Sequence, residues 1–318
     1  MKVAIVFDGH ALARAAAPDV AGVFSAVLAV ERALAAFGHR TVRVPVANDD
    51  AWRHHLLAWA PEVVFNLCEG VAGDSGEEAT VAEAIERMHL PVTGAPAEAL
   101  ARARRKEHVN ALLAGTVPVA AWMLAEPAAI AAWCDYPAIV KPAHEDAGIG
   151  ITRQAVVGST AELSAALHAA RAHAPLLVQR FLPGRELVVG FVGECTLPVA
   201  EIEYDAMPAG LPRVVGYAAK WDPGSPEDIG TAARCPARVD AAVAAEAIGT
   251  ARAAWHALTD RGYARVDLRA DQEGVLHVLD VNLNPDLSPD AGLARMAAAA
   301  GWSYSGLVER ILLEAVRT

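Results

Sequence analysis

The stretch RVDLRADQEGVLHVLDVNLNPDL, residues 265–287, decides the fold. Apolar and polar residues alternate on both sides of the turn ADQEG, which is the pattern of two strands in a β-hairpin. Asp267 stands on the first strand, Asp280 on the second, and Asn282 two residues later. Carboxylates held in a largely buried hairpin are costly unless a cation meets them. Hard oxygen ligands of this kind suit Mg²⁺. A solvated polar hairpin edge is the competing interpretation.

A second informative stretch is YPAIVKPAHEDAGIGI, residues 136–151. Lys141 ends an apolar strand, Pro142 prevents helix continuation, and a glycine-bearing loop follows. An ammonium group beside backbone N–H groups of such a loop is suited to binding phosphate. A strand-end lysine in solvent is the alternative. The stretch does not match the P-loop pattern, in which GK[ST] opens a helix.

Composition excludes several classes of protein. The chain has 318 residues, 54% of them hydrophobic, and a formal net charge of −11, which argues against a nucleic-acid or anionic-membrane surface. The start, MKVAIVFDGH, lacks the apolar segment of a signal peptide, and no run of membrane-spanning length is present. The scattered cysteines fit reduced thiols in a cytoplasmic protein: Cys68, Cys134, Cys195 and Cys235.

The first 95 residues alternate strands with helices, which predicts an open parallel sheet. Strands are expected at 2–7, 40–46, 61–67 and 91–94, and helices at 23–37 and 79–90. Ligands of such sheets bind beyond the carboxyl ends of the strands, where Asp8 and Glu69 fall. No GxGxxG follows the first strand, so a dinucleotide oxidoreductase is not expected.

The remaining chain mixes strands and helices less regularly. A helix or helix pair is expected at 97–115, and further helices at 159–172, 241–258 and 304–316. Strands are expected within 116–124, 136–144 and 175–193. The stretch 203–236 is rich in Pro, Gly and Asp, and it is expected to form a long functional loop.

The order of these segments resembles the ATP-grasp superfamily, and most closely D-alanine–D-alanine ligase and its relatives. The resemblance runs from about Phe65 to Val316 and rests on FNLCEG, LPVTGAP, FLPGRELVVG, ARCPA, GYARVDLR, VNLNPDLSPDAG and AAAAGWSYSGLVERIL. It implies an α/β (α+β) ATP-grasp fold. The implied domains are an amino-terminal Rossmann-like parallel-sheet domain at 1–95, a small central α+β domain at 96–182, and a carboxy-terminal antiparallel-sheet domain with the metal and catalytic site at 183–318.

The resemblance also implies roles for individual residues. Lys106 and Lys141 match the lysines that contact nucleotide phosphates, and HEDAGIG, with Glu145, matches the mobile loop that closes over them. The adenine and ribose positions correspond to Gln179, Arg180, Phe181, Leu182 and Glu186. The catalytic positions are Arg265, which steadies the oxyanion or transferred phosphate, and Lys220 of the covering loop. The magnesium ligands are Asp267, Asp280 and Asn282, with Asp280 in place of the usual glutamate.

The activity implied by the resemblance is ATP-dependent ligation of a carboxylate to an amine. The carboxylate, expected to belong to an amino acid, is activated as an acylphosphate, and ADP and phosphate are released. ATP and Mg²⁺, or Mn²⁺ in its place, are the expected cofactors, and small molecules rather than nucleic acid or membrane are the expected partners. Relatives are usually homodimers. A catalytically inactive ATP-binding scaffold is the alternative of another class.

The substrate-binding positions depart from the dipeptide-forming relatives. Ala147 and Gly148 occupy the positions of loop serines, and Trp221 that of a tyrosine. Asp19 is the candidate for the missing glutamate of the first helix, Glu69 replaces a histidine, and Asp286 replaces a glycine. The serine–leucine pair that receives the second substrate's carboxylate is not evident in SPDAGL. The substrates are therefore not required to be two D-alanines, and ligation of an unusual amino acid or ring closure within one molecule fits equally well. True D-alanine–D-alanine ligation is the second candidate.

Overall fold

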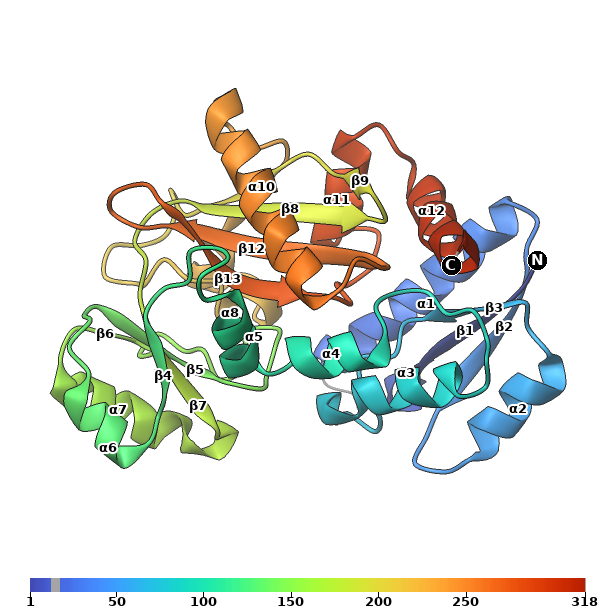
Figure 1. The fold of residues 1–318 in the computed structure, drawn as a ribbon, viewed down its shortest axis with the longest axis horizontal. Coiled ribbons are helices and arrows are strands. Elements are labelled where there is room, and N and C mark those ends of the chain that lie inside the picture. The colour runs from blue at the N-terminus through green and yellow to red at the C-terminus, as the bar shows by residue number, and fades with distance from the viewer. Residues whose placement is uncertain (13–17, 318) are drawn as a thin grey trace.

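The computed structural model describes residues 1–12 and 18–317, which form three β-sheets with helices packed on them (Figure 1). The first sheet is parallel, with strand order β2-β1-β3, as the alternation of strands and helices predicts. Its strands are β1 (Lys2–Asp8), β2 (Arg40–Val46) and β3 (Val63–Asn66).

Alternate residues of β1 point to opposite faces, and both faces are buried. Val3 and Ile5 pack toward α1 (Pro18–Ala36) and α12 (Tyr304–Arg317), whereas Ala4 and Val6 pack against α2 (Ala51–Trp59) and α3 (Glu78–Glu86). The predicted strand at 91–94 is wrong, because Val92 makes only one bridge, to Val64, before the chain turns at Gly94. The helix α2 is an addition to the sequence prediction.

The second sheet is antiparallel, with order β4-β7-β5-β6. It consists of β4 (Trp122–Leu124), β5 (Ala138–Pro142), β6 (Val156–Val157) and β7 (Leu176–Arg180). Two helices, α6 (Pro127–Ala132) and α7 (Thr160–Ala170), cover one face, where Val140 and Val178 are buried. Lys141 and Gln179 alternate onto the opposite face. The region before this sheet forms the helix pair α4 (Ala97–Ala103) and α5 (Lys106–Leu113).

The third sheet is also antiparallel, with order β11-β10-β8-β12-β13 and β9 paired to β8. Its strands are β8 (Glu186–Val192), β9 (Cys195–Thr196), β10 (Ala200–Glu203), β11 (Ala232–Arg234), β12 (Tyr263–Ala270) and β13 (Leu276–Asn282). The helix α10 (Ala241–Leu258) covers one face, and α11 (Gly292–Ala299) packs on part of the other. The stretch predicted as a loop contains β11 and two short helices, α8 (Tyr217–Trp221) and α9 (Pro226–Ile229).

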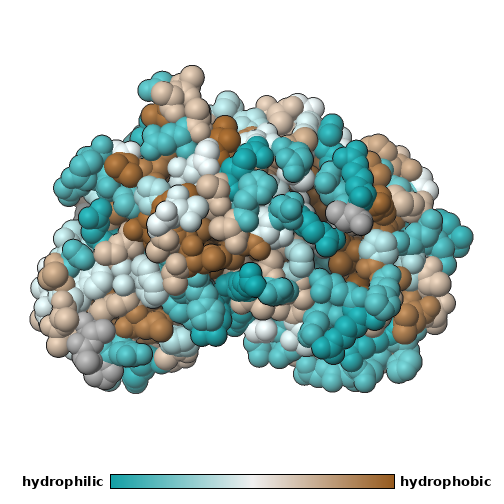
Figure 2. Space-filling model, viewed as in Figure 1, coloured by the Kyte–Doolittle hydropathy of each residue, from teal (hydrophilic) through white to brown (hydrophobic). Residues whose placement is uncertain are grey.

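The first and third sheets share a hydrophobic core, because Val188, Val192 and Tyr263 pack with residues of β1, α1 and α12. In Figure 2 the second sheet with its helices, at the left, and the first sheet with its helices, at the right, form two lobes along the lower edge of the molecule, with a notch between them. Each sheet falls within one of the predicted domains, and the domain boundaries themselves stay a prediction. In the described residues no helix is long and apolar enough to cross a membrane.

Candidate active site

A β-bulge in β13 brings the predicted metal ligands together. Asp267 pairs with Asp280, but the next residue of β12, Leu268, pairs with Val278, so that Leu279 is an extra residue. Without the bulge, Asp280 would lie on the same face as Val278, which is buried against α10. The extra residue instead turns Asp280 to the face that carries Asp267.

The third predicted ligand, Asn282, pairs with Arg265 one step further along the same face. Arg265 donates from Nε to Asp267 Oδ1 at 2.9 Å and from Nη2 to Oδ2 at 3.2 Å. The Asp267 carboxylate raises the pKa of Arg265, which keeps the guanidinium charged. The hairpin therefore places Arg265, Asp267, Asp280 and Asn282 on one surface, and their roles stay a prediction.

The charge on this surface is arranged around Asp280. Burial raises the pKa of the Asp280 carboxyl; nearby Lys106 opposes the shift, and the Asp146 and Asp267 carboxylates add to it. A divalent cation would relieve that repulsion. In the described part of the chain no three or more His, Cys, Asp or Glu side chains gather as a metal cage. The two carboxylates and one amide of Asp267, Asp280 and Asn282 fit Mg²⁺, which proteins bind through one or two carboxylates together with water and phosphate oxygens.

Two lysines from different elements act through their charges on Asp280. Lys106 begins α5, and its Nζ donates to Glu145 O at 2.8 Å and to Asp146 Oδ1 at 2.7 Å, and lies 3.9 Å from Asp280 Oδ1. Burial would lower the pKa of Lys106, but Asp280 and Asp146 hold it above its usual value. Lys141 is buried on β5, and this burial, with the charge of Lys106, lowers the pKa of Lys141 to about 8. Two cations this close are suited to an anionic phosphate chain.

The glycine-bearing loop is closed by contacts with the segment that carries α8. The Trp221 indole donates from Nε1 to Ala147 O at 3.0 Å, and Tyr217 N donates to Ile151 O at 3.1 Å. Gly148 has φ +76°, and a Cβ there would lie 2.9 Å from the carbonyl carbon of Gly216, so glycine permits this crossing. The Trp221 indole thus bonds to the backbone carbonyl of Ala147, one of the two positions where the resemblance implies a loop serine.

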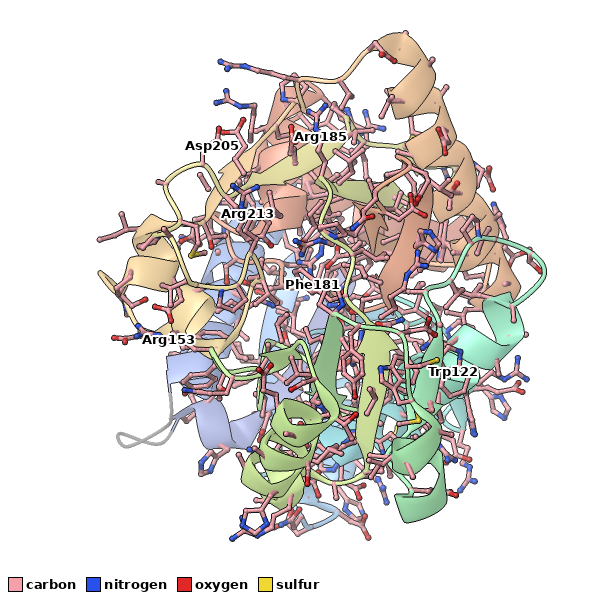
Figure 3. All side chains as sticks on the ribbon, turned by 90° about the vertical axis from the view of Figure 1, so that its left-hand side faces the viewer. Trp122, Arg153, Phe181, Arg185, Asp205 and Arg213 are labelled. Carbon is pink, nitrogen blue, oxygen red and sulfur yellow. The ribbon has the colours of Figure 1, made fainter. Side chains whose placement is uncertain are left out.

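A second link joins the same two segments further along. Arg153 forms a bidentate pair with Glu227, with Nη2 donating to Oε2 at 2.8 Å. In Figure 3 Arg153 lies on the loop below the segment that contains α9. Lys220 lies on α8, and its side chain as a whole is exposed. Desolvation of its ammonium group, followed by the charge of Arg265, nevertheless lowers the pKa of Lys220.

The predicted nucleobase positions lie where the second sheet meets the third sheet. Figure 3 shows Phe181 at this junction, and the Arg269 guanidinium lies 4.8 Å from the Phe181 ring centre. Gln179 is buried, and its amide Nε2 has no hydrogen-bond partner among the described residues. A buried donor without a partner is expensive, and a purine ring nitrogen would satisfy it. Leu182 is buried, and Arg180 lies 3.6 Å from Asp271.

Glu186, the predicted ribose-binding residue, is buried and partly engaged. Its Oε2 accepts hydrogen bonds from Tyr204 Oη at 2.6 Å and from Arg269 Nη1 at 3.0 Å. Burial raises the pKa of Glu186, although Arg269 and then the Tyr204 hydrogen bond oppose this. No described residue donates to the other oxygen, Oε1, which leaves it available to a ribose hydroxyl.

The predicted substrate residues do not lie together in the way that the predicted metal and phosphate residues do. Glu69 is exposed, and the exposed Asp286 accepts a hydrogen bond from Ser288 N at 2.7 Å. Asp19 belongs to α1, but its side chain lies outside the described part. Asp8 has a structural role, since it accepts hydrogen bonds from the N–H groups of Ala72 and Gly73 and so holds the loop after β3.

The sequence analysis did not single out two residues at the site, Glu78 and Asn284. Asn284 donates from Nδ2 to Glu78 Oε1 at 2.8 Å, across 206 positions. Tyr263 donates to Asn284 Oδ1 at 2.8 Å, and the Asn284 N–H donates to Asn282 Oδ1 at 2.9 Å. Burial raises the pKa of Glu78 to about 7, with Asn284 opposing and Asp146 adding to the shift. No local sequence pattern relates Glu78 to Asn284. The one feature that could have pointed to Asn284 is its position two residues after the predicted metal ligand Asn282.

Comparisons with known proteins agree with this geometry. A family model described as D-ala D-ala ligase C-terminus matches residues 116–313. A D-alanine–D-alanine ligase of Frankia casuarinae is 33% identical over 288 residues, covering 88% of this chain and 73% of the relative.

Solved structures are similar over the whole chain. A D-alanine–D-alanine ligase of Bacillus anthracis complexed with ATP has a TM-score of 0.75 at 17% identity, covering 100% of this chain and 98% of the other. The VanG D-Ala:D-Ser ligase of Enterococcus faecalis has a TM-score of 0.76 at 18% identity, covering 99% of each chain. At these identities the likeness is one of fold, and it confirms the predicted ATP-grasp architecture.

Proposed function

The chain belongs to the D-alanine–D-alanine ligase family of ATP-dependent carboxylate–amine ligases, and on this premise we propose that it holds Mg²⁺ and ATP between the second and third sheets and joins an amino acid to an amine. The observation that carries the proposal is the bulged hairpin, which gathers Asp267, Asp280 and Asn282 on the face near Lys106. Gln179 and Glu186 each leave a polar atom available for the nucleoside.

The chemistry follows from the charges of these groups. A carboxylate is a poor electrophile, and transfer of the terminal phosphoryl group of ATP gives it a good leaving group before an amine attacks. Mg²⁺, which Asp267, Asp280 and Asn282 would hold, supplies positive charge to the phosphate oxygens. Lys106, Lys141 and Arg265 offset the charge that develops on the transferred group and on the oxyanion that follows.

The closed loops protect the activated acid. Water would hydrolyse an acylphosphate before the amine reached it unless the site excluded solvent. The bonds from Trp221 to Ala147 and from Arg153 to Glu227 hold the glycine-bearing loop against the segment with α8 and α9. We infer that these contacts form when substrates are bound and open for product release.

The substrate side supports a pair of substrates other than two D-alanines. Trp221 can donate a hydrogen bond but not accept one, so it does not reproduce the relay of a tyrosine and a serine. Glu69 introduces a carboxylate where dipeptide-forming relatives have a histidine. D-alanine–D-alanine ligation is the second candidate, and the name of the Frankia relative favours it.

A substrate screen tests these proposals. The protein is incubated with ATP, Mg²⁺ and pooled D- and L-amino acids, and ADP and ligated products are measured by mass spectrometry. We expect Mg²⁺-dependent ADP release together with an amide product. D-alanyl-D-alanine as the dominant product would select the second candidate, and ATP binding without turnover in every pool would favour an inactive scaffold. Light scattering on the same sample tests the expected homodimer.

A further inference from the structure

We propose that Glu78 receives the ammonium group of the amino acid whose carboxylate is activated, and that Asn284 is the positioning residue that fixes Glu78 for this role. The inference rests on the proposed function and deepens it. It names the group by which the site would distinguish an amino acid from a plain carboxylic acid.

The Glu78 carboxylate is anchored through one oxygen only. Glu78 is the first residue of α3, and its Oε1 accepts the hydrogen bond from Asn284 Nδ2 at 2.8 Å. No described residue donates to Oε2, and no described Lys, Arg or His forms an ion pair with this carboxylate. A partly buried carboxylate held in this way has one oxygen ready for a donor from a ligand.

Asn284 has its orientation set by several partners at once. Its Oδ1 faces the phenol of Tyr263, and its Nδ2 faces Glu78 and, at 3.4 Å, Cys68 O. Exchanging the amide oxygen and nitrogen would place oxygen against a carboxylate and a carbonyl, so the network fixes one orientation. Because the Asn284 N–H also donates to Asn282, Glu78 is held in a fixed relation to the metal hairpin.

The charges around Glu78 suit an ammonium ion. Burial raises its pKa, and Asp146, which is hydrogen-bonded to Lys106, adds to the shift. The charge of Arg104 opposes the shift, but its Nη1 donates to Ser75 Oγ at 3.2 Å and forms no ion pair with Glu78. The ionised carboxylate is therefore costly until a cation approaches, and a substrate ammonium would supply that cation.

The position of Glu78 matches the geometry of an amino acid. The reacting carboxylate must lie against the terminal phosphate, near Lys106 and Asp280. Its amino group is only one carbon away, so the residue that receives it must border the same space. Glu78 borders that space because Asn284, which donates to Glu78 Oε1, also donates from its N–H to Oδ1 of the predicted metal ligand Asn282. Glu69 and Asp286 are exposed.

The test compares an amino acid with its desamino analogue. The pooled screen identifies the amino acid that is activated, and the analogue has hydrogen in place of the amino group. Hydroxylamine is added as the trapping nucleophile; it displaces phosphate from the acylphosphate and forms a hydroxamate, which is measured together with ADP. The proteins are the wild type, Glu78→Gln and Glu78→Asp, with Glu83→Gln as the matched control, because Glu83 is on α3 but is exposed and paired with Arg87.

We expect Glu78→Gln to raise the KM for the amino acid about 10- to 100-fold, the usual loss for a hydrogen bond between charged groups. The KM for the desamino analogue should stay within twofold of wild type, because that acid has no ammonium to lose. Glu78→Asp should retain part of the preference for the amino acid, and Glu83→Gln all of it.

Two outcomes overturn the inference separately from the proposed function. An equal loss on both acids in Glu78→Gln and Glu78→Asp would make Glu78 a structural residue, and no loss on either acid would remove it from the site. A wild-type protein that releases no ADP with any pooled amino acid would refute the proposed function itself, and the inference with it.

Discussion

Glu78→Gln is predicted to make the protein more stable, and increasingly so as the pH rises. The Glu78 carboxyl has a pKa of about 7 in the folded chain against an ordinary value of 4.5, so folding favours its protonated form. The stability associated with this group is fully present below pH 4.5 and is lost as the pH rises through 7. The shift corresponds to a cost of about 3 kcal/mol at pH 8 and less than about 1 kcal/mol at pH 5.

Glutamine removes this cost and keeps the contact that matters, because its amide oxygen still accepts the bond from Asn284 Nδ2. The measurement is urea unfolding followed by tryptophan fluorescence at pH 5 and pH 8, with Glu83→Gln as the control. The control should change the free energy of unfolding by no more than about 0.5 kcal/mol at either pH. A Glu78→Gln protein that gained no more stability at pH 8 than at pH 5 would refute the reasoning. Such a gain, coupled to weaker substrate binding, is expected of a functional carboxylate.

Three further predictions concern the nucleotide and the loops. Asp280→Ala and Asn282→Ala should each abolish Mg²⁺-dependent ADP release while the circular dichroism spectrum stays native, and near-normal turnover in either would contradict the metal assignment. ATP binding above pH 8 should take up a proton, seen by calorimetry in buffers of different ionisation enthalpy, because the free Lys141 loses its charge through about pH 8; Lys141→Arg should show no such uptake. Trp221→Phe removes the bond to Ala147 O, worth about 1 kcal/mol, and should raise the ratio of ADP to ligated product, whereas Trp133→Phe, whose indole bonds only Asp135 O, should not.

Much of the fold was predictable because its signals are local. The parallel strands β1 and β3 are largely apolar runs, and the two strands of the hairpin at β12 and β13 alternate around a glycine turn. The helix α7 is capped by Ser159, whose side chain accepts a hydrogen bond from the Glu162 N–H. Errors occurred where local propensity is weak. A single bridge at Val92 is not enough for a strand, and the short helices α8 and α9 depend on contacts with the glycine-bearing loop.

The sequence by itself determined the ATP-grasp family of the chain, and it predicts the phosphate, nucleoside and metal residues, since each lies in a short segment whose pattern is informative. Tertiary structure decided which of these side chains meet. The bulge at Leu279 turns Asp280 and Asn282 away from the core, whereas strand periodicity alone would have placed both on the buried face of Val278. Likewise, Glu78 and Asn284 are 206 positions apart and meet only because the first and third sheets share a core. A residue pattern encodes local geometry, whereas contacts between distant segments depend on the packing of the whole chain.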